Sequence, residues 1–278
     1  MNTAIVIDSS SEISQKLFSK FHIYPLGYVV RDSNNETHTE KTKIQTIETS
    51  KLLSIIEKDN QADLFAPSIK DFVEIYTFLA EEYDSLISIH SSMATPVVFE
   101  NALVAKKMVS EISIDVIDTH TLGSSSGLFV EELSRFISTA KNINEIRKEA
   151  ISLDKHINSF IITRNEHLNS DELKRIQWRR NSSSSFKSYY LFNYFHTKWN
   201  PISNSRNTKS LFSDIHDKLE VITKTKDLKN VYFSSSSNFS SEVKATLGKL
   251  RKVSKTEVNP TLVASYLIGN NYFDISFV

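Results

Sequence analysis

Short apolar runs recur along the first half of the chain, and each ends in polar residues. The run Ala4–Ile7 predicts a buried strand that ends at the polar residues Asp8–Ser11. The runs Leu86–Ile89 and Ile114–Ile117 predict two further buried strands. Continuous apolar runs of this length are typical of parallel strands that are covered on both faces. We therefore expect a parallel sheet in this part of the chain.

The segments between and after these runs have the apolar spacing of amphipathic helices. Ser68 and Asp71 predict a capping box at the start of the first of them. The spacing predicts helices over 69–83, 99–112 and 145–153, and another that follows the Gly- and Ser-rich stretch 121–127. Because strands and helices alternate, the pattern indicates the α/β class.

The pattern changes near residue 158. A predicted strand over 160–163 is followed by helical segments that polar loops separate. The last residues, Tyr272–Val278, alternate apolar and polar side chains, which predicts a strand with one buried face. A chain of 278 residues also exceeds the usual size of one domain. We predict a two-domain α/β fold, with an N-terminal parallel-sheet α/β domain over residues 1–156 and a C-terminal mixed α+β domain over residues 157–278.

Composition removes several functional classes. The chain has 33 Lys and Arg residues against 33 Asp and Glu residues, which is not the footprint of a nucleic-acid-binding protein. It contains no cysteine, which excludes disulfides, thiolate zinc sites and a cysteine nucleophile. Its first residues lack the pattern of a signal peptide, and no apolar run approaches the ~20 residues that span a bilayer. We expect a cytoplasmic protein with no integral membrane segment and no nucleic-acid partner.

The sequence His90-Ser91-Ser92 is the best candidate for catalysis, because polar groups just past a buried strand lie where open α/β sheets place their ligands. A serine hydrolase would display its nucleophile on a glycine-flanked turn, and no glycine follows here. The alternative is that Ser91, Ser92 and Thr95 cap the next helix and present hydroxyls and amides to an anion or a carboxylate. We expect the chain to bind a ligand and not to be an enzyme.

Metal and nucleotide sites are not supported by the spacing of candidate ligands. Asp8 and Asp118 each follow a predicted strand and could hold a metal ion as a pair, but such aspartates more often cap a helix or lock a turn. The five glycines form no phosphate-binding loop, and the eight histidines form no zinc-peptidase pair. We expect no metal and no cofactor.

The second half of the chain is locally basic. Arg175, Arg179, Arg180 and Arg206 lie there, and guanidinium groups suit a phosphate or an acidic partner. The alternative is that these side chains are simply solvated.

In their order along the chain, several landmarks resemble the DegV, or fatty-acid-binding, family. The resemblance is clearest from residue 4 to about 135, and it rests on the following segments: Ile5–Ser10, Tyr24–Leu26, Pro67–Ser68, Leu86–Ser92 with Phe99–Ala102, Val116–Thr119, and Ser124–Gly127. Weaker similarity continues at Leu173–Ile176 and at Trp199–Ile202 with Arg206.

The resemblance implies a carrier that holds a fatty acid in a tunnel between its two domains and presents the carboxyl group to a separate fatty-acid kinase. It places Ser91 and Ser92 near that carboxyl group, and Arg175 and Arg206 where the family meets the kinase. The bound fatty acid would be a ligand and not a cofactor. Burial of an acyl chain yields ~0.8 kcal/mol per methylene, while a few hydroxyls can fix the head group.

The chain departs from the family pattern at three of the implied ligand positions. Leu64 and Phe65 stand where the family has threonine and serine, and Tyr266 replaces a histidine. We therefore take Ser91, Ser92, Thr95, Leu64, Phe65 and Tyr266 as the ligand-binding positions. The alternative is an interaction or regulatory protein that keeps the DegV fold but has lost the lipid, with these bulky side chains filling the tunnel.

Overall fold

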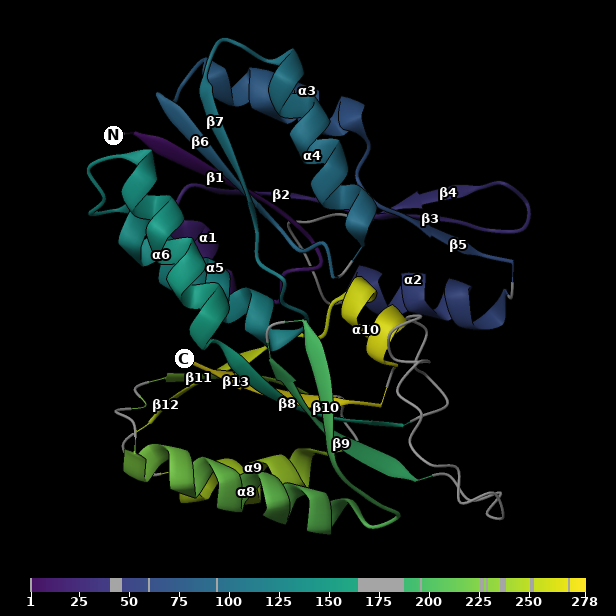
Figure 1. Cartoon of the computed structure of the whole chain (residues 1–278). Helices are drawn as coiled ribbons and strands as arrows, with labels where there is room; N and C mark the ends of the chain where they lie inside the picture. The colour runs from purple at the N-terminus through teal and green to yellow at the C-terminus, as the bar shows by residue number, and fades with distance from the viewer. Residues whose placement is uncertain are drawn as a thin grey trace.

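The computed structural model describes residues 2–40, 47–59, 61–93, 95–164, 188–195, 197–225, 228, 230–235, 239–250, 253–269 and 271–278. Figure 1 shows two layered units, one above the other. Arg175, Arg179 and Arg180 lie outside the described residues.

The first unit contains the expected parallel sheet. Its strands are β1 (Thr3–Asp8), β2 (Ile23–Leu26), β6 (Ser85–His90) and β7 (Ser113–Asp118), in the order β2-β1-β6-β7. Alternate residues of the strands point to opposite faces, and both faces are covered. Ala4 and Val6 pack against helices α3 (Ile69–Ala80) and α4 (Pro96–Met108). Ile5 and Ile7 pack on the side of α1 (Gln15–Lys20), α5 (Ser124–Ile137) and α6 (Ile143–His156).

A small antiparallel sheet extends from the side of this unit (Figure 1). It consists of β4 (Thr37–Thr39), β3 (Val29–Arg31) and β5 (Asp63–Phe65), in that order. Helix α2 (Ile47–Lys58) contacts β3 and also α10 (Leu262–Ile268), which comes from the end of the chain.

The second unit is a mixed six-stranded sheet. Its strands, in sheet order, are β10 (Lys198–Ser205), β9 (Tyr189–Phe195), β8 (Asn158–Arg164), β13 (Phe273–Phe277), β11 (Asn230–Ser235) and β12 (Ser254–Val258). Helices α8 (Thr208–Thr225) and α9 (Ser240–Lys249) cover one face (Figure 1). The change of sheet falls between α6 and β8, while the exact limits 1–156 and 157–278 stay a prediction.

The two units share a helix. The start of α5 packs against β11 and β13 as well as against its own sheet. The prediction that β13 has one buried face is therefore wrong, because Asp274 and Ser276 are fully buried under the first unit. The alternation in the sequence showed which residues of β13 share a face. Whether the polar face is buried depends on the contact between the two units.

The boundaries of helices α4 and α5 also differ from expectation. Helix α4 begins at Pro96, since proline fits the first turn, and it ends at Met108. Helix α5 begins at Ser124, inside the Gly- and Ser-rich stretch, after Gly123 with a φ of +64°. The capping box of Ser68 and Asp71 is confirmed, with both reciprocal hydrogen bonds present.

Candidate functional site

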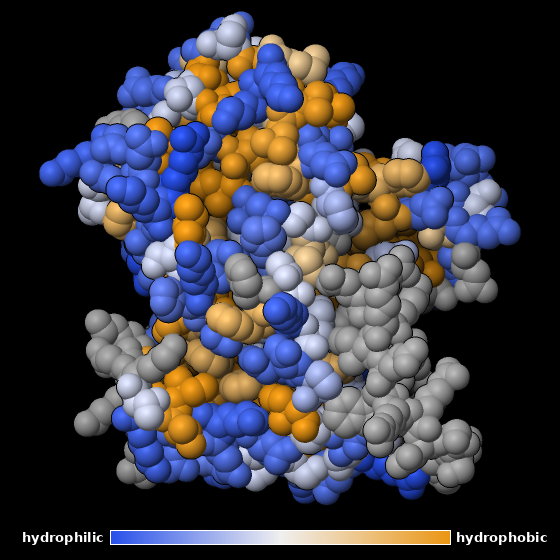
Figure 2. Space-filling model, in the orientation of Figure 1, coloured by the Kyte–Doolittle hydropathy of each residue, from blue (hydrophilic) through white to orange (hydrophobic). Residues whose placement is uncertain are grey.

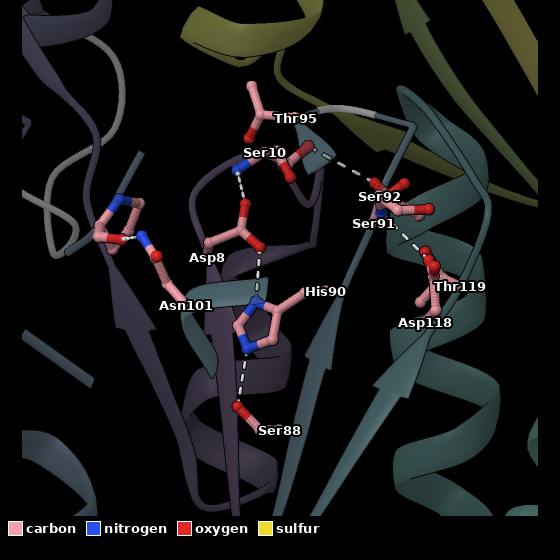
Figure 3. Close-up of polar contacts among 12 residues, drawn as sticks. Asp8, Ser10, Ser88, His90, Ser91, Ser92, Thr95, Asn101, Asp118 and Thr119 are labelled. Carbon is pink, nitrogen blue, oxygen red and sulfur yellow. Dashed lines mark hydrogen bonds and ion pairs between the residues drawn. The ribbon is translucent and has the colours of Figure 1, made fainter. Parts of the chain in front are cut away.

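Three polar loops meet at the edge of the parallel sheet that faces the second unit. They follow β1, β6 and β7, whose carboxyl ends lie side by side because the strands are parallel (Figure 3). Three of the six candidate ligand-binding residues, Ser91, Ser92 and Thr95, lie in the second of these loops. This position at the strand ends is the usual ligand site of open α/β sheets.

His90 lies in a buried chain of hydrogen bonds that points into the sheet and away from Ser91 and Ser92 (Figure 3). Its Nδ1 lies 2.7 Å from Asp8 Oδ2, and its Nε2 lies 2.6 Å from Ser88 Oγ. Tyr76 donates its hydroxyl to Ser88 Oγ at 2.6 Å. Because a carboxylate only accepts, His90 Nδ1 donates to Asp8, and in this neutral tautomer Nε2 accepts from Ser88.

This order of groups resembles a Ser-His-Asp triad, but Ser88 is fully buried beneath Tyr76. A substrate has no access to its hydroxyl in this conformation. The hydrolase hypothesis paired His90 with Ser91 or Ser92, and the structure does not bring those hydroxyls to the imidazole.

The three residues expected to cap α4 form hydrogen bonds with other parts of the site. Ser91 Oγ donates to the carbonyl of Thr121 at 2.5 Å, and the backbone N–H of Ser92 donates to Asp118 Oδ1 at 3.0 Å. Thr95 stands at the N-cap position of α4, as expected, but its side chain forms no capping hydrogen bond. Its Oγ1 instead lies 2.7 Å from the hydroxyl of Tyr28.

Asp8 and Asp118 each stabilise a turn, which is one of the two interpretations that the sequence allowed. Asp8 Oδ1 accepts from the N–H of Ser10 at 2.9 Å, and Asp118 Oδ1 accepts from the N–H of His120 at 3.1 Å. Each aspartate is thus engaged by its own turn.

Tyr28 was not identified from the sequence, yet it joins two parts of the site. Its ring is fully buried. Burial, and then the charge of Asp8, raise the pKa of its hydroxyl well above the usual value, so Tyr28 stays a neutral phenol that can donate a hydrogen bond. The buried hydroxyl of Ser10 lies near that of Tyr28 but forms no hydrogen bond of good geometry with a described residue. A ligand oxygen could satisfy this group.

An apolar cluster fills the seam between the two units, and we call it the seam cluster. Its buried members come from both units: Tyr28, Val30, Leu52, Leu122, Ile161, Phe192, Tyr194, Trp199, Leu262, Val263, Ala264, Ile268 and Tyr272. Partly buried side chains, among them Leu64, Met93 and Leu267, pack against it.

The three residues that depart from the family pattern lie in different surroundings. Leu64 pairs with Val30 and packs against the seam cluster. Phe65 is the next residue of the strand, so it points to the opposite face, where it is 39% exposed and lies under the guanidinium of Arg31. Tyr266 is half-buried on α10. Leu64 and Phe65 therefore do not line one common cavity.

Arg206 is exposed in the turn between β10 and α8. This turn lies on the helix-covered side of the second unit. Arg175 lies outside the described residues, so the predicted pair of contacts for a kinase stays a prediction.

Two carboxyl groups from distant parts of the chain meet in the interior, and we call Glu12 and Asp274 the acid pair. Glu12 Oε1 accepts from the hydroxyl of Tyr272 at 2.5 Å and from the N–H of Thr261 at 3.1 Å, while its Oε2 has no partner in the described structure. Asp274 accepts from the N–H of Ser124 at 2.8 Å.

Burial raises the pKa of both acids. The pKa of Glu12 lies well above its usual value, and the charge of Asp274 raises it further. Burial raises the pKa of Asp274 to about 7. Burial therefore favours the neutral forms, and the two carboxyl groups are not both ionised near neutral pH.

Three cavities are lined by described residues, and none of them is lined by a buried member of the seam cluster. One lies between the second sheet and α8, one beside α2 and the β3–β4 turn, and one between α8 and α9. Two groups of residues with metal-ligand chemistry, Asp32–Glu36–His38 and His216–Asp217–Glu220, also lie at the surface, away from the strand ends.

Comparison with known proteins gives one consistent family. The family model described as uncharacterised proteins of the DegV family matches residues 2–169. Protein DegV of Bacillus subtilis is 26% identical over 166 residues, which cover 58% of this chain and 57% of that protein. The chain therefore spans little more than half the length of the curated relatives it matches.

Solved structures agree over a longer span. The structure of DegV from Bacillus subtilis, described as a fatty acid binding protein, has a TM-score of 0.82 at 20% identity and covers 100% of this chain and 99% of its own. The Fatty Acid Kinase (Fak) B3 protein of Streptococcus pneumoniae, loaded with linoleic acid, has a TM-score of 0.76 at 10% identity, with 100% and 99% coverage. At these identities the likeness shows the fold alone.

None of the described helices combines the length and apolar character that a membrane span requires. The two-domain fold agrees with the solved DegV structures, and the family model covers more than half of the chain. This chain therefore belongs to the DegV family.

Proposed function

We propose that the chain is a non-catalytic carrier that binds a fatty acid between its two domains. In this proposal the acyl chain lies along the seam cluster, and the carboxyl group lies beside the hydroxyls of Ser10, Tyr28 and Thr95. One observation carries the proposal: Tyr28 packs its ring in the seam cluster and places its hydroxyl 2.7 Å from Thr95 Oγ1. The apolar wall and the polar end are therefore continuous.

The energetics support a long ligand. Each methylene that leaves water contributes ~0.8 kcal/mol, so the chain provides most of the affinity. The hydroxyls contribute orientation, since each net hydrogen bond is worth about 1 kcal/mol. The solved relatives support the ligand class, because Fak B3 of Streptococcus pneumoniae is loaded with linoleic acid.

We expect side chains at the edge of the seam cluster to move when an acyl chain binds, because the central members of the cluster are fully packed. Leu64, Met93 and Leu267 are suited to this, because they are only partly buried. Presentation of the carboxyl group to a fatty-acid kinase is the further step of the proposal, and the name of the Fak B3 relative supports it.

Two measurements test whether the chain binds a fatty acid. Organic extraction of the purified protein, followed by mass spectrometry, should release about one fatty acid per chain. Titration of delipidated protein with oleate should change the fluorescence of Trp199, which lies in the seam cluster. The Trp178→Phe variant removes the second tryptophan and isolates this signal. No extracted lipid together with no response of Trp199 would refute the proposal.

A second candidate is an interaction protein that has lost the lipid. The packing of Leu64 into the seam cluster and the replacement of a family histidine by Tyr266 favour it. The same titration separates the two, because this candidate expects no saturable response to oleate in either the parent chain or the Leu64→Ser variant.

A further inference from the structure

The cavity between the second sheet and α8 is independent of the seam. It has a volume of about 710 Å³, which falls within the range of small-molecule sites. Phe160 of β8 and Phe277 of β13 line it. Ile161, the neighbour of Phe160, points to the opposite face and belongs to the seam cluster. The sheet therefore separates this cavity from the proposed fatty-acid site.

The wall opposite the phenylalanines is also apolar. Val221 and Ile222 line the cavity from the last turns of α8, and Val221 is 61% exposed. Figure 2 shows apolar side chains at the surface of this unit, above its hydrophilic helix layer. An apolar side chain at the mouth of a concave site favours contact with the apolar part of a ligand.

Three amide side chains form a row across the floor. Asn158, Asn193 and Asn200 come from the adjacent strands β8, β9 and β10, and Asn193 is the register partner of Asn200. The amide of Asn193 is held in place, since it donates to Asn158 Oδ1 at 3.4 Å and to the carbonyl of Ser159 at 3.1 Å. Asn200 is exposed, and its side chain forms no hydrogen bond with a described residue. It can donate to a ligand.

Two charged residues also line the cavity. Lys218 is half-buried in its wall and forms no ion pair with any described residue. Its neighbour Asp217 also lines the cavity but is exposed. An ammonium group without a counter-ion at the wall of a concave site favours an anion, because the interaction is screened less there than in open water. The more exposed carboxylate opposes an anion less strongly.

We propose that this cavity is a second ligand site, which takes a compact amphipathic organic anion with its apolar body between Phe160, Phe277 and Val221 and its acidic group at Lys218. The site would act separately from the seam, on the outer face of the second sheet. The proposal does not rest on fatty-acid binding.

The test uses 1-anilinonaphthalene-8-sulfonate, an aromatic probe with one acidic group, on the full chain. Its fluorescence should rise to saturation at one site, and saturating oleate should not displace it. Lys218→Met keeps the aliphatic stem and should weaken binding about two- to fivefold, while Asp217→Asn should tighten it by a similar factor. Lys224→Met is the control, because Lys224 lies on the same helix, pairs with Glu220 and does not line the cavity.

Opposite effects of the two cavity variants, with an unchanged control, support the site. Equal affinity in all three variants would overturn it, since a non-specific apolar contact does not respond to the sign of the charge. Displacement of the probe by oleate would also overturn it, because the probe would then occupy the seam. Circular dichroism should be unchanged in each variant, because none of the three side chains is fully buried.

Discussion

The acid pair makes the stability of this protein depend on pH, and Glu12→Gln tests the reason. Glutamine keeps an acceptor for the donors Tyr272 and Thr261 and places an N–H₂ group where Glu12 Oε2 lacks a partner. It is therefore a neutral substitute for the protonated acid. We expect the variant to fold and to differ from the parent chain in its response to pH more than in its structure.

The sign follows from the direction of the pKa shifts. Both acids have a raised pKa in the folded protein, so the folded chain binds more protons than the unfolded chain above about pH 4. The stabilisation by the pair is fully present below the unfolded pKa values. It is lost as the pH rises, for Asp274 up to its folded value of about 7.

Each retained proton changes the free energy of unfolding by at most about 1.4 kcal/mol per pH unit. The Glu12→Gln variant lacks this proton, so its free energy of unfolding should fall less steeply with pH, by up to this amount. Between pH 5 and pH 8 the variant should therefore gain up to about 4 kcal/mol relative to the parent chain. Entry of water into the deprotonated pair reduces the gain, so a difference above 1 kcal/mol already supports the reasoning.

The assay is urea unfolding followed by circular dichroism at pH 5, 6, 7 and 8. Asp63→Asn serves as the control, because Asp63 is an exposed carboxylate that lies 3.9 Å from Arg31 at the surface. Parallel curves of stability against pH for the Glu12→Gln variant and the parent chain would refute the assignment of protons to the pair.

Three further predictions concern single contacts. Ser68→Ala removes the capping box of α3 and should lower the free energy of unfolding by about 1 kcal/mol in chemical denaturation. Gly127→Ala should prevent normal folding or lower the free energy of unfolding by more than about 3 kcal/mol, because a Cβ atom there would lie 1.7 Å from the carbonyl oxygen of Glu12. A melting temperature equal to that of the parent chain would contradict this position of α5 against Glu12. Tyr28→Phe keeps the ring but removes the hydroxyl beside Thr95, so it should weaken oleate binding about two- to tenfold in the Trp199 titration, and unchanged affinity would place the carboxyl group elsewhere.

The sequence predicted the local structure of the first unit well. Its strands are short and apolar on both faces, and the helices between them have a clear apolar stripe, so β1, β6, β7 and α3 are found at the expected residues. The order of motifs also identified the family before any tertiary contact was known.

The candidate site was only partly predictable. The strand-end position of Ser91 and Ser92 follows from parallel topology and is visible in the sequence. Tyr28 gave no such signal, because a single tyrosine after a short strand is typical of many surfaces. Its role depends on its approach to Thr95, 67 residues further along the chain.

The polar interior could not be read from the sequence at all. Asp274 follows the alternation of a strand whose polar face is expected in water, and Glu12 lies in a polar loop. Only the docking of the second sheet onto the start of α5 buries both carboxyl groups together, 262 positions apart. Local periodicity determines which residues share a face, whereas the protonation of a buried group depends on what covers that face. The sequence by itself therefore determined the elements and the family, and the contact between the two units decided the chemistry of the seam.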